Sequence, residues 1–137
     1  MNCPVHILAT CRKPELAPMT RLVFDTLRVG FPTNPVTVHL NHGCESHCPD
    51  ILADCERVNA TIKRCEMIHH AWIEWLVASN SEPFYILDTD LIFYGNIEPW
   101  QHSGPLAGYL VPEWIDEYSG CVTRARLHPS DRGNTGQ

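Results

Sequence analysis

The sequence predicts an α/β domain with a mostly parallel sheet and flanking helices. Two observations predict this class. Near the N-terminus, an apolar run at residues 5–9, an amphipathic segment at 19–29 and an alternating run at 36–40 follow one another as strand, helix and strand. Later, residues 84–87 form an unbroken apolar and aromatic run, which suits a strand buried on both faces of a parallel sheet. A helical crossover of this kind connects parallel strands, and it is right-handed in nearly all proteins.

The predicted helix at residues 19–29 has one apolar face and a clear end. Its apolar residues recur at three- and four-residue steps, at Met19, Leu22, Val23 and Leu27. Gly30 and Pro32 follow it, as a C-terminal glycine and a helix breaker do. The preceding residues, 10–18, contain two prolines, so we expect a loop there.

The longest helix that the spacing predicts covers residues 57–78. Its apolar stripe consists of Val58, Ile62, Cys65, Ile68, Trp72, Trp75 and Leu76. Each large side chain that such a stripe buries fully stabilises a fold by roughly 1.5–3 kcal/mol. Helical spacing accounts for both Trp72 and Trp75, so we expect them in the core rather than at a ligand.

The length of 137 residues predicts a single domain, which we place at residues 1–127. Within it, residues 106–111 and 121–127 are predicted to form further strands. Residues 128–137 have no apolar anchor, so we expect them to form a flexible tail.

Composition narrows the classes of function. The hydrophobic share of 44% is enough for a packed core, and the net charge of −6 argues against broad binding to nucleic acids or anionic membranes. No stretch approaches the roughly 20 apolar residues of a membrane-spanning helix, and the N-terminus lacks the pattern of a signal peptide. Seven cysteines, an odd number, are most simply free thiols in a reducing compartment, so we expect a cytoplasmic protein.

Two acidic residues directly after the predicted buried strand form the main candidate site. Asp88 and Asp90 are separated by one residue, so in extended chain both carboxylates point to the same side. Alone they would repel each other, whereas a hard divalent cation, Mn²⁺ or Mg²⁺, that joins them to a phosphate would remove the conflict. The alternative is that both residues only cap a turn, which is a common use of aspartate.

The segment at residues 85–93, Tyr-Ile-Leu-Asp-Thr-Asp-Leu-Ile-Phe, resembles the DxD motif of GT-A-type glycosyltransferases, which use nucleotide-diphosphate sugars. Judged by the order of elements, the resemblance extends over residues 5–127. It implies the Rossmann-like nucleotide-binding half of a GT-A fold, with Asp90 as a direct metal ligand and Asp88 assisting through the metal or the ribose. It also implies that the loop after the first strand helps to hold the nucleotide, which makes Thr10 and Arg12 candidate contacts.

The two candidate loops are expected at one edge of the sheet. Ligands of open α/β sheets bind at the carboxyl ends of the strands. Thr10 and Arg12 follow one predicted strand, and Asp88 and Asp90 follow another. We therefore expect all four residues on one rim, open to solvent. The alternative for Arg12 is an ordinary solvated charge, because loops carry both kinds of residue.

Residues 42–69 contain a second possible site, because they are rich in cysteine and histidine. The zinc-type side chains are His42, Cys44, His47, Cys48, Cys65 and His69. Their spacing matches no zinc module and includes no Cys-x2-Cys pair, and Cys65 also fits the apolar stripe of the predicted helix. A disulfide between Cys44 and Cys48 is a further alternative, which suits the cytosol less.

The sequence leaves several functions to compare. The leading expectation is a glycosyltransferase-type domain that binds a nucleotide-diphosphate sugar through a divalent cation. Nucleotidyl transfer uses similar acids, but it often has a glycine-rich loop after the first strand, and residues 10–16 contain no glycine. A non-catalytic remnant or a zinc-stabilised interaction module is the alternative from another class. Because the chain ends soon after the motif, we expect a truncated copy or a minimal nucleotide-binding half, and we assign no catalytic base or nucleophile.

Overall fold

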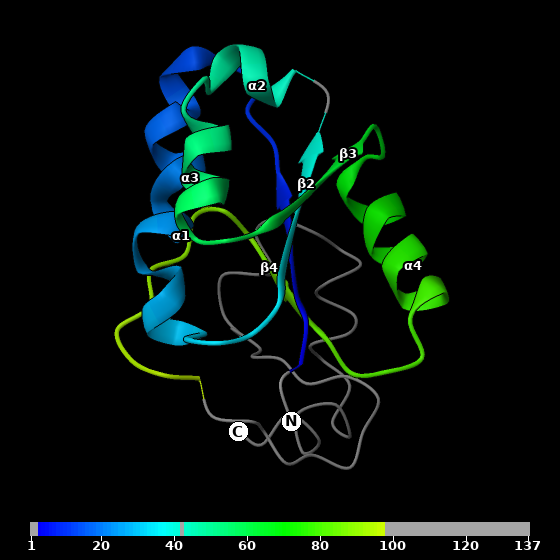
Figure 1. Ribbon diagram of the computed structural model, residues 1–137. Coiled ribbons are helices and arrows are strands. Elements are labelled where there is room, and N and C mark those ends of the chain that lie inside the picture. Colours follow the sequence, from blue (N-terminus) through cyan, green and yellow to red (C-terminus); the bar gives the residue numbers. More distant parts are fainter. Residues whose placement is uncertain (1–2, 42, 98–137) are drawn as a thin grey trace, which may run out of the picture. The chain divides into compact units, whose positions relative to one another are not determined.

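Parallel strands form the centre of the fold. The structure, a computed structural model, describes residues 3–41 and 43–97, and within them four strands make one sheet in the order β3-β2-β1-β4 (Figure 1). The strands are β1 (Val5–Ala9), β2 (Val36–Asn41), β3 (Thr61–Cys65) and β4 (Tyr85–Leu87). The helices are the 3-10 turn η1 (Pro14–Leu16) and the α-helices α1 (Ala17–Gly30), α2 (Cys44–His47), α3 (Ile51–Arg57) and α4 (His69–Ser79). The predicted α/β class and the parallel sheet are confirmed.

The first three predicted elements are present. β1 has the predicted bounds, and β2 extends one residue further, to Asn41. α1 is longer than predicted at both ends, and Pro18 lies inside its first turn instead of in the preceding loop. A proline is tolerated there because the first amide groups of a helix have no partner within the helix.

Helices cover both faces of the sheet. Ile7 of β1 is fully buried in a core cluster that includes Phe24 of α1. Leu8, the next residue along β1, belongs to a second cluster with Trp72 of α4. Successive strand residues point to opposite faces, so β1 is buried on both sides. Figure 1 accordingly shows α1 and α3 on one side of the sheet and α4 on the other.

The long helix predicted at residues 57–78 is wrong. α3 ends at Arg57, β3 follows, and α4 begins only at His69. Part of the predicted apolar stripe is therefore exposed: Ile68 is 61% exposed and Trp75 is 40% exposed, although Trp72 is fully buried as expected. The three- and four-residue spacing runs by coincidence from the residue after α3 through β3 and into α4.

A specific cap ends α3 at Arg57. Asn59 has a left-handed backbone conformation with φ of 54°. The Asn59 amide donates to the carbonyl of Glu56, and the Ala60 amide donates to the carbonyl of Cys55, both at 2.9 Å. This is the Schellman motif, in which asparagine is the usual alternative to glycine at the left-handed position. The chain then pairs with β2, where Ile62 lies opposite Val38.

Strand β4 is less buried than its apolar sequence predicts. We expected residues 84–87 to be buried on both faces, but Ile86 is 36% exposed, and Leu87 is the one buried residue of the run. Within the described residues β4 pairs with β1 alone, so there it lies at the edge of the sheet. A strand with one neighbour keeps one side open, which accounts for the exposure.

Some of the sequence-based predictions cannot be compared with the structure. The chain divides into Met1–Glu98 and a second unit, Pro99–Gln137. The predicted strands at 106–111 and 121–127 and the predicted tail at 128–137 lie in the second unit, outside the described residues.

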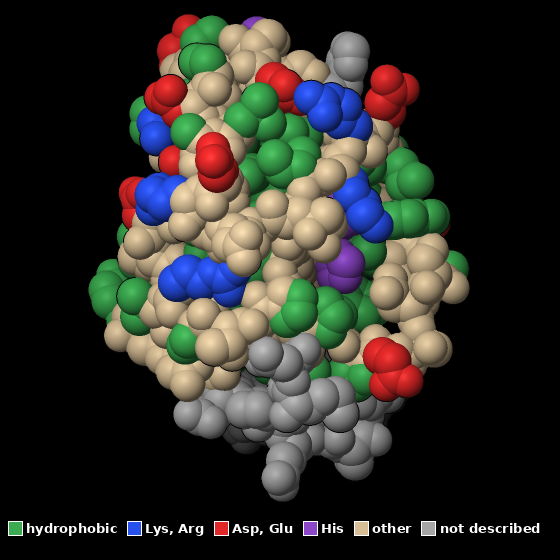
Figure 2. Space-filling view, viewed as in Figure 1, with side chains coloured by type: hydrophobic (Ala, Val, Ile, Leu, Met, Phe, Trp, Pro, Cys, Tyr) green, Lys and Arg blue, Asp and Glu red, His purple; other side chains and the backbone are tan. Residues whose placement is uncertain are grey.

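In the part that is described, no helix is long and apolar enough to cross a membrane. On the face in Figure 2, acidic and basic side chains are interspersed.

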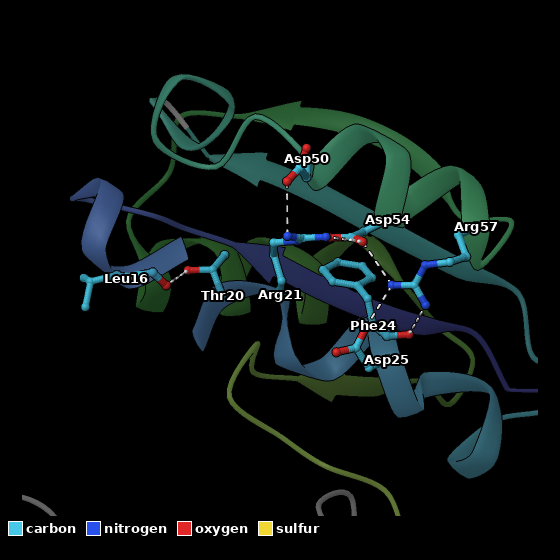
Figure 3. Close-up of polar contacts among 8 residues, drawn as sticks. All are labelled: Leu16, Thr20, Arg21, Phe24, Asp25, Asp50, Asp54 and Arg57. Carbon is cyan, nitrogen blue, oxygen red and sulfur yellow. Dashed lines mark hydrogen bonds and ion pairs between the residues drawn. The ribbon is translucent and has the colours of Figure 1, made fainter. Parts of the chain in front are cut away.

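A buried carboxylate ties α3 to α1. Asp54 of α3 is 3% exposed, and both of its carboxylate oxygens accept hydrogen bonds from Arg21 of α1 (Figure 3). Arg57 donates to Asp54 at 3.0 Å and to Asp25 of α1 at 3.1 Å. Burial alone would raise the pKa of Asp54, but the hydrogen bonds from Arg21 and Arg57 outweigh it and lower that pKa below its usual value. The two helices are therefore joined by charge as well as by apolar packing.

We expect Asp54→Asn to lower the free energy of unfolding by about 2–3 kcal/mol, because two arginines lose a shared, buried anion. Water compensates part of the loss, since the side chains of Arg21 and Arg57 are 39% and 48% exposed. Asp50→Asn is the matched control: Asp50 also pairs with Arg21, at 3.2 Å, but it is 67% exposed, so its loss should be below about 1 kcal/mol. Urea unfolding measures both variants, and equal losses would contradict the assignment.

Two histidines lie on the face of the sheet that α4 covers. Nδ1 of His6 is 3.1 Å from Nε2 of His39, and the rings of His39 and Trp72 form a T-shaped contact with their centres 5.2 Å apart. His39 is 2% exposed. Its burial, together with the charges of His6 and Lys63, lowers its pKa to about 4. His39 is therefore neutral in the folded protein at pH 7.

The burial of His39 predicts that the folded protein is less stable in acid. Unfolded histidine takes up a proton near pH 6.5, whereas folded His39 does so only near pH 4, so the free energy of unfolding should fall as the pH drops through this window. The slope is at most about 1.4 kcal/mol per pH unit for one group. His39→Leu should flatten it, whereas His70→Gln, at an exposed position, should not. Urea unfolding at several pH values in this window tests this, and an unchanged slope in His39→Leu would assign the effect elsewhere.

Candidate functional site

The order of the strands creates a switch point between β1 and β4. β1, β2 and β3 follow one another in one direction across the sheet, whereas β4 lies on the other side of β1. The pairings are parallel, and Ile7 of β1 lies opposite Leu87 of β4. The segments after β1 and after β4 therefore leave the same edge of the sheet as neighbours. Open α/β sheets bind ligands in the crevice at such a point.

The predicted site residues are found in these two segments. Thr10 is the first residue after β1, and Asp88 is the first after β4. Thr10, Arg12, Asp88 and Asp90 are all exposed. Within residues 3–41 and 43–97, no hydrogen bond or ion pair joins the two segments directly. The structure thus brings the four residues to one edge, and their joint contact with a ligand stays a prediction.

Helix α1 holds the backbone of both segments. The hydroxyl of Thr20 donates to the carbonyl of Thr10 at 3.1 Å, and the amide of Val23 donates to the carbonyl of Thr89 at 3.2 Å. Thr20 and Val23 are three positions apart and so lie on one side of the helix. The backbone of each candidate loop is therefore anchored, while the side chains of Asp88 and Asp90 remain open to solvent.

The chain after the motif continues along α1. The Phe93 amide donates to the hydroxyl of Thr26 at 2.9 Å, and the Ile97 amide donates to the carbonyl of Gly30 at 2.8 Å. Phe93 packs directly on Gly30, where an added Cβ would lie 2.5 Å from a ring carbon. Gly30 thus allows the close approach of this segment, in addition to ending the helix.

The first loop is held from its interior. Cys11 is buried, and its thiol donates to the carbonyl of Lys13 at 3.2 Å. Arg12, between them, is exposed and forms no ion pair with any carboxylate of the described residues. An unpaired guanidinium beside the switch point is suited to a phosphate, because it offers several donors in one plane.

His69 is the neighbour of Asp88 that the sequence did not predict. His69 is the first residue of α4, and its Nε2 lies 3.4 Å from Oδ1 of Asp88. The sequence grouped His69 with Cys65 as a zinc-type ligand. Its position beside Asp88 depends on how α4 is oriented against β4, which no local pattern records.

The capping alternative for the two aspartates gains no support. Thr89 and Asp90 do lie in a turn, but neither carboxylate accepts a backbone hydrogen bond within the described part of the chain. Asp88 contacts His69, and no lysine or arginine there pairs with Asp88 or Asp90. The two residues thus offer exposed carboxylate oxygens, the donor type that Mn²⁺ and Mg²⁺ prefer.

The donor set fits a divalent cation only with help from a ligand. Among the residues that the structure describes, no three or more metal-ligating side chains are grouped closely enough to hold an ion by themselves. Mg²⁺ commonly binds proteins through one or two carboxylates together with phosphate oxygens and water. The two exposed carboxylates of Asp88 and Asp90 would suit this kind of coordination.

The zinc-type residues lie in separate surroundings. Cys44 and Cys48 are fully buried in the core cluster beside α1, whereas Cys65 belongs to the cluster under α4. His69 lies next to Asp88, and His42 is outside the described residues. Burial raises the pKa of Cys44 to about 12 and that of Cys55 to about 11, so these thiols stay protonated at neutral pH. A protonated, buried thiol acts as a small hydrophobic group.

Thiol titration tests this description. All six described cysteines are free: Cys3, Cys11, Cys44, Cys48, Cys55 and Cys65. Apart from Cys3, they are buried, so the native protein should react slowly at five thiols. In denaturant without reductant, all seven cysteines of the chain should react. A count of five or fewer would indicate a disulfide, and zinc released on unfolding would support the interaction-module alternative.

A small pocket of about 280 Å³ lies at the carboxyl ends of β2 and β3. It is lined by Leu40, Asn41, Gly43, Glu45, Ser46, Arg64, Cys65 and Glu66. Arg64 and Glu45 form an ion pair at 2.6 Å within this lining. The pocket is at the same edge of the sheet as the candidate loops, but on the other side of β1 from β4.

Comparison with known proteins identifies no family. No protein-family model, no curated protein and no solved structure matches this chain. The function is therefore argued from the motif and from the geometry of the switch point.

Proposed function

We propose that this chain is a glycosyltransferase-type domain that binds a nucleotide-diphosphate sugar through Mn²⁺ or Mg²⁺ at Asp88 and Asp90. The observation that carries the proposal is the position of the Asp-Thr-Asp sequence. It follows β4 directly, beside the loop after β1, at the switch point of a parallel sheet. This is the place where open α/β sheets bind nucleotides.

The charge balance at this edge supports a ligand that brings its own cation. Asp88 and Asp90 are exposed and have no lysine or arginine partner in the described part of the chain. Two close carboxylates repel unless a cation neutralises them. A nucleoside diphosphate is itself an anion, so it approaches such a pair favourably only together with a divalent metal ion.

Each residue has a role in the proposed complex. Asp90 would hold the cation directly, and Asp88 would assist through the metal or the ribose, as the DxD resemblance implies. Thr10 and Arg12 contact the nucleotide from the neighbouring loop, and the guanidinium of Arg12 suits its phosphates. A cation held there would supply positive charge to the diphosphate leaving group when the bond between sugar and oxygen breaks. Binding, rather than transfer, is therefore the part of the activity that this domain accounts for.

The proposal predicts that nucleotide affinity depends on manganese through Asp90. Asp90→Asn keeps the shape of the side chain but removes one anionic ligand. We expect wild type to bind uridine or guanosine diphosphate at least tenfold more tightly with manganese than without it, and the variant to lose most of that difference. Calorimetric titration of both proteins, with and without manganese, measures the effect.

Glu82→Gln is the matched control. Glu82 is an exposed carboxylate before β4, at the opposite end of that strand from the motif. Its loss changes the net charge as Asp90→Asn does, but it should leave the manganese dependence intact. Equal nucleotide affinity in wild type and Asp90→Asn, with and without the metal, would overturn the proposal.

A further inference from the structure

We propose that the face of the sheet on which α4 packs carries a second ligand site, which binds an oxyanion such as sulfate or phosphate between His6 of β1 and Lys63 of β3. This inference goes beyond the proposed function, because it concerns a different part of the sheet from Asp88 and Asp90. It is carried by a cluster of hydrogen-bond donors and positive charges that is built around the contact between His6 and His39.

This face of the sheet is polar where a parallel sheet is usually apolar. His6 lies opposite Thr37 of β2, and Thr37 lies opposite Thr61 of β3. Directly opposite residues of neighbouring strands point to the same face, so an imidazole and two hydroxyl groups form one row across three strands. His6 and Thr37 are partly buried, and Thr61 is exposed. Since both faces of a parallel sheet are normally covered and apolar, a partly open polar row is better suited to a ligand than to a core.

Lys63 adds a positive charge that no acid compensates. It lies opposite His39 in the pairing of β2 with β3, and it is exposed. Its neighbour Arg64 pairs with Glu45 at 2.6 Å, whereas no carboxylate of the described residues pairs with Lys63 or with either histidine. Burial lowers the pKa of both His6 and His39, and the charge of Lys63 adds to this effect at both rings. An anion is therefore the missing partner of this cluster.

The contact between the two histidines suits His6 to an anion. Nδ1 of His6 lies 3.1 Å from Nε2 of His39. His39 is 2% exposed and neutral at pH 7, so its ring can accept a hydrogen bond from Nδ1 of a protonated His6. The Nε2–H group of that imidazolium is then left to donate to a ligand. A bound anion favours this state, because an opposite charge nearby raises the pKa of an imidazole.

A buried donor beside His39 also has no partner. Trp72 of α4 is fully buried, and its Nε1 forms no hydrogen bond with any described residue. Its ring centre lies 5.2 Å from that of His39, and Trp75, which is 40% exposed, contacts His39 from the same helix at 6.0 Å. Buried polar groups nearly always have a partner, so an orphaned N–H group in this cluster is a second sign that an acceptor is missing. An oxyanion has acceptor oxygens on every side.

The inference predicts that anion binding and protonation of His6 are coupled. The probe is sulfate on the full chain, because sulfate stays a dianion throughout the range in which histidine titrates. We expect saturating sulfate to raise the pKa of His6 by about one unit, followed through its imidazole signals in nuclear magnetic resonance spectra. By linkage, sulfate should bind more tightly as the pH falls through the pKa of His6 in the complex. Sodium chloride at equal ionic strength controls for screening.

Variants of Lys63 test the other half of the site. Lys63→Gln should weaken sulfate binding about tenfold near pH 6 and remove most of the shift at His6, because a charge-assisted hydrogen bond is lost. Lys63→Arg keeps the charge and the donors, so it should bind sulfate nearly as wild type does. Lys13→Gln is the matched control, because Lys13 is also exposed and its loss changes the net charge equally. Circular dichroism checks that each variant is folded.

The outcomes decide the inference without involving the switch point. It fails if sulfate leaves the pKa of His6 unchanged, if sodium chloride raises that pKa as much as sulfate does, or if wild type and Lys63→Gln bind sulfate equally. A sulfate-dependent shift that Lys63→Gln removes, and that Lys63→Arg and Lys13→Gln retain, establishes the site. None of these results depends on manganese or on Asp90, so the proposed function stands or falls by its own experiment.

Discussion

The parallel pairing of β1 with β2 on one side and with β4 on the other is the constraint on which the rest of this structure depends. Parallel neighbours require crossover connections, and these are right-handed in nearly all proteins. The chain moves in one direction across the sheet from β1 to β3 and in the opposite direction to β4. Right-handed crossovers in opposite directions use opposite faces, which explains why α1 and α3 lie on one face and α4 on the other (Figure 1).

That arrangement connects the core to the candidate site through α1. The helix buries Phe24 and Leu27 against the sheet. From its other positions, Thr20 and Val23 hold the carbonyls of the two loops at the switch point. Each loop is thus tied to α1 by a hydrogen bond to its backbone. The side chain of Asp88, next to Thr89, remains 66% exposed.

The sequence predicts the fold where local pattern and tertiary contacts agree. The strand–helix–strand unit at the N-terminus is right because apolar periodicity, proline and glycine all indicate the same elements. The helix predicted at residues 57–78 is wrong because the cap at Asn59 is a weaker local signal than the coincidental apolar spacing. In addition, β3 is largely exposed, so buried and exposed residues do not alternate along it as in a typical strand. The position of Asp88 and Asp90 directly after a parallel strand is predictable from the motif. Their neighbour His69 is not, because its position depends on the packing of α4.

The difference in surroundings between Asp54 and the pair Asp88 and Asp90 is the strongest physical argument for the cation that we propose at the switch point. Asp54, which joins two helices, has two arginines bound to it, and the hydrogen bonds from them lower its pKa against the opposing effect of burial. Asp88 and Asp90 carry the same carboxylate group as Asp54. In the described residues, however, their one ion pair joins Asp88 to the imidazole of His69. The charge of Asp54 is thus compensated by arginines within the fold, whereas Asp88 and Asp90 have no lysine or arginine partner among the described residues. Exposed carboxylates without a lysine or arginine partner in the described residues are open to a counter-ion from solution, which agrees with the ligand binding that we propose.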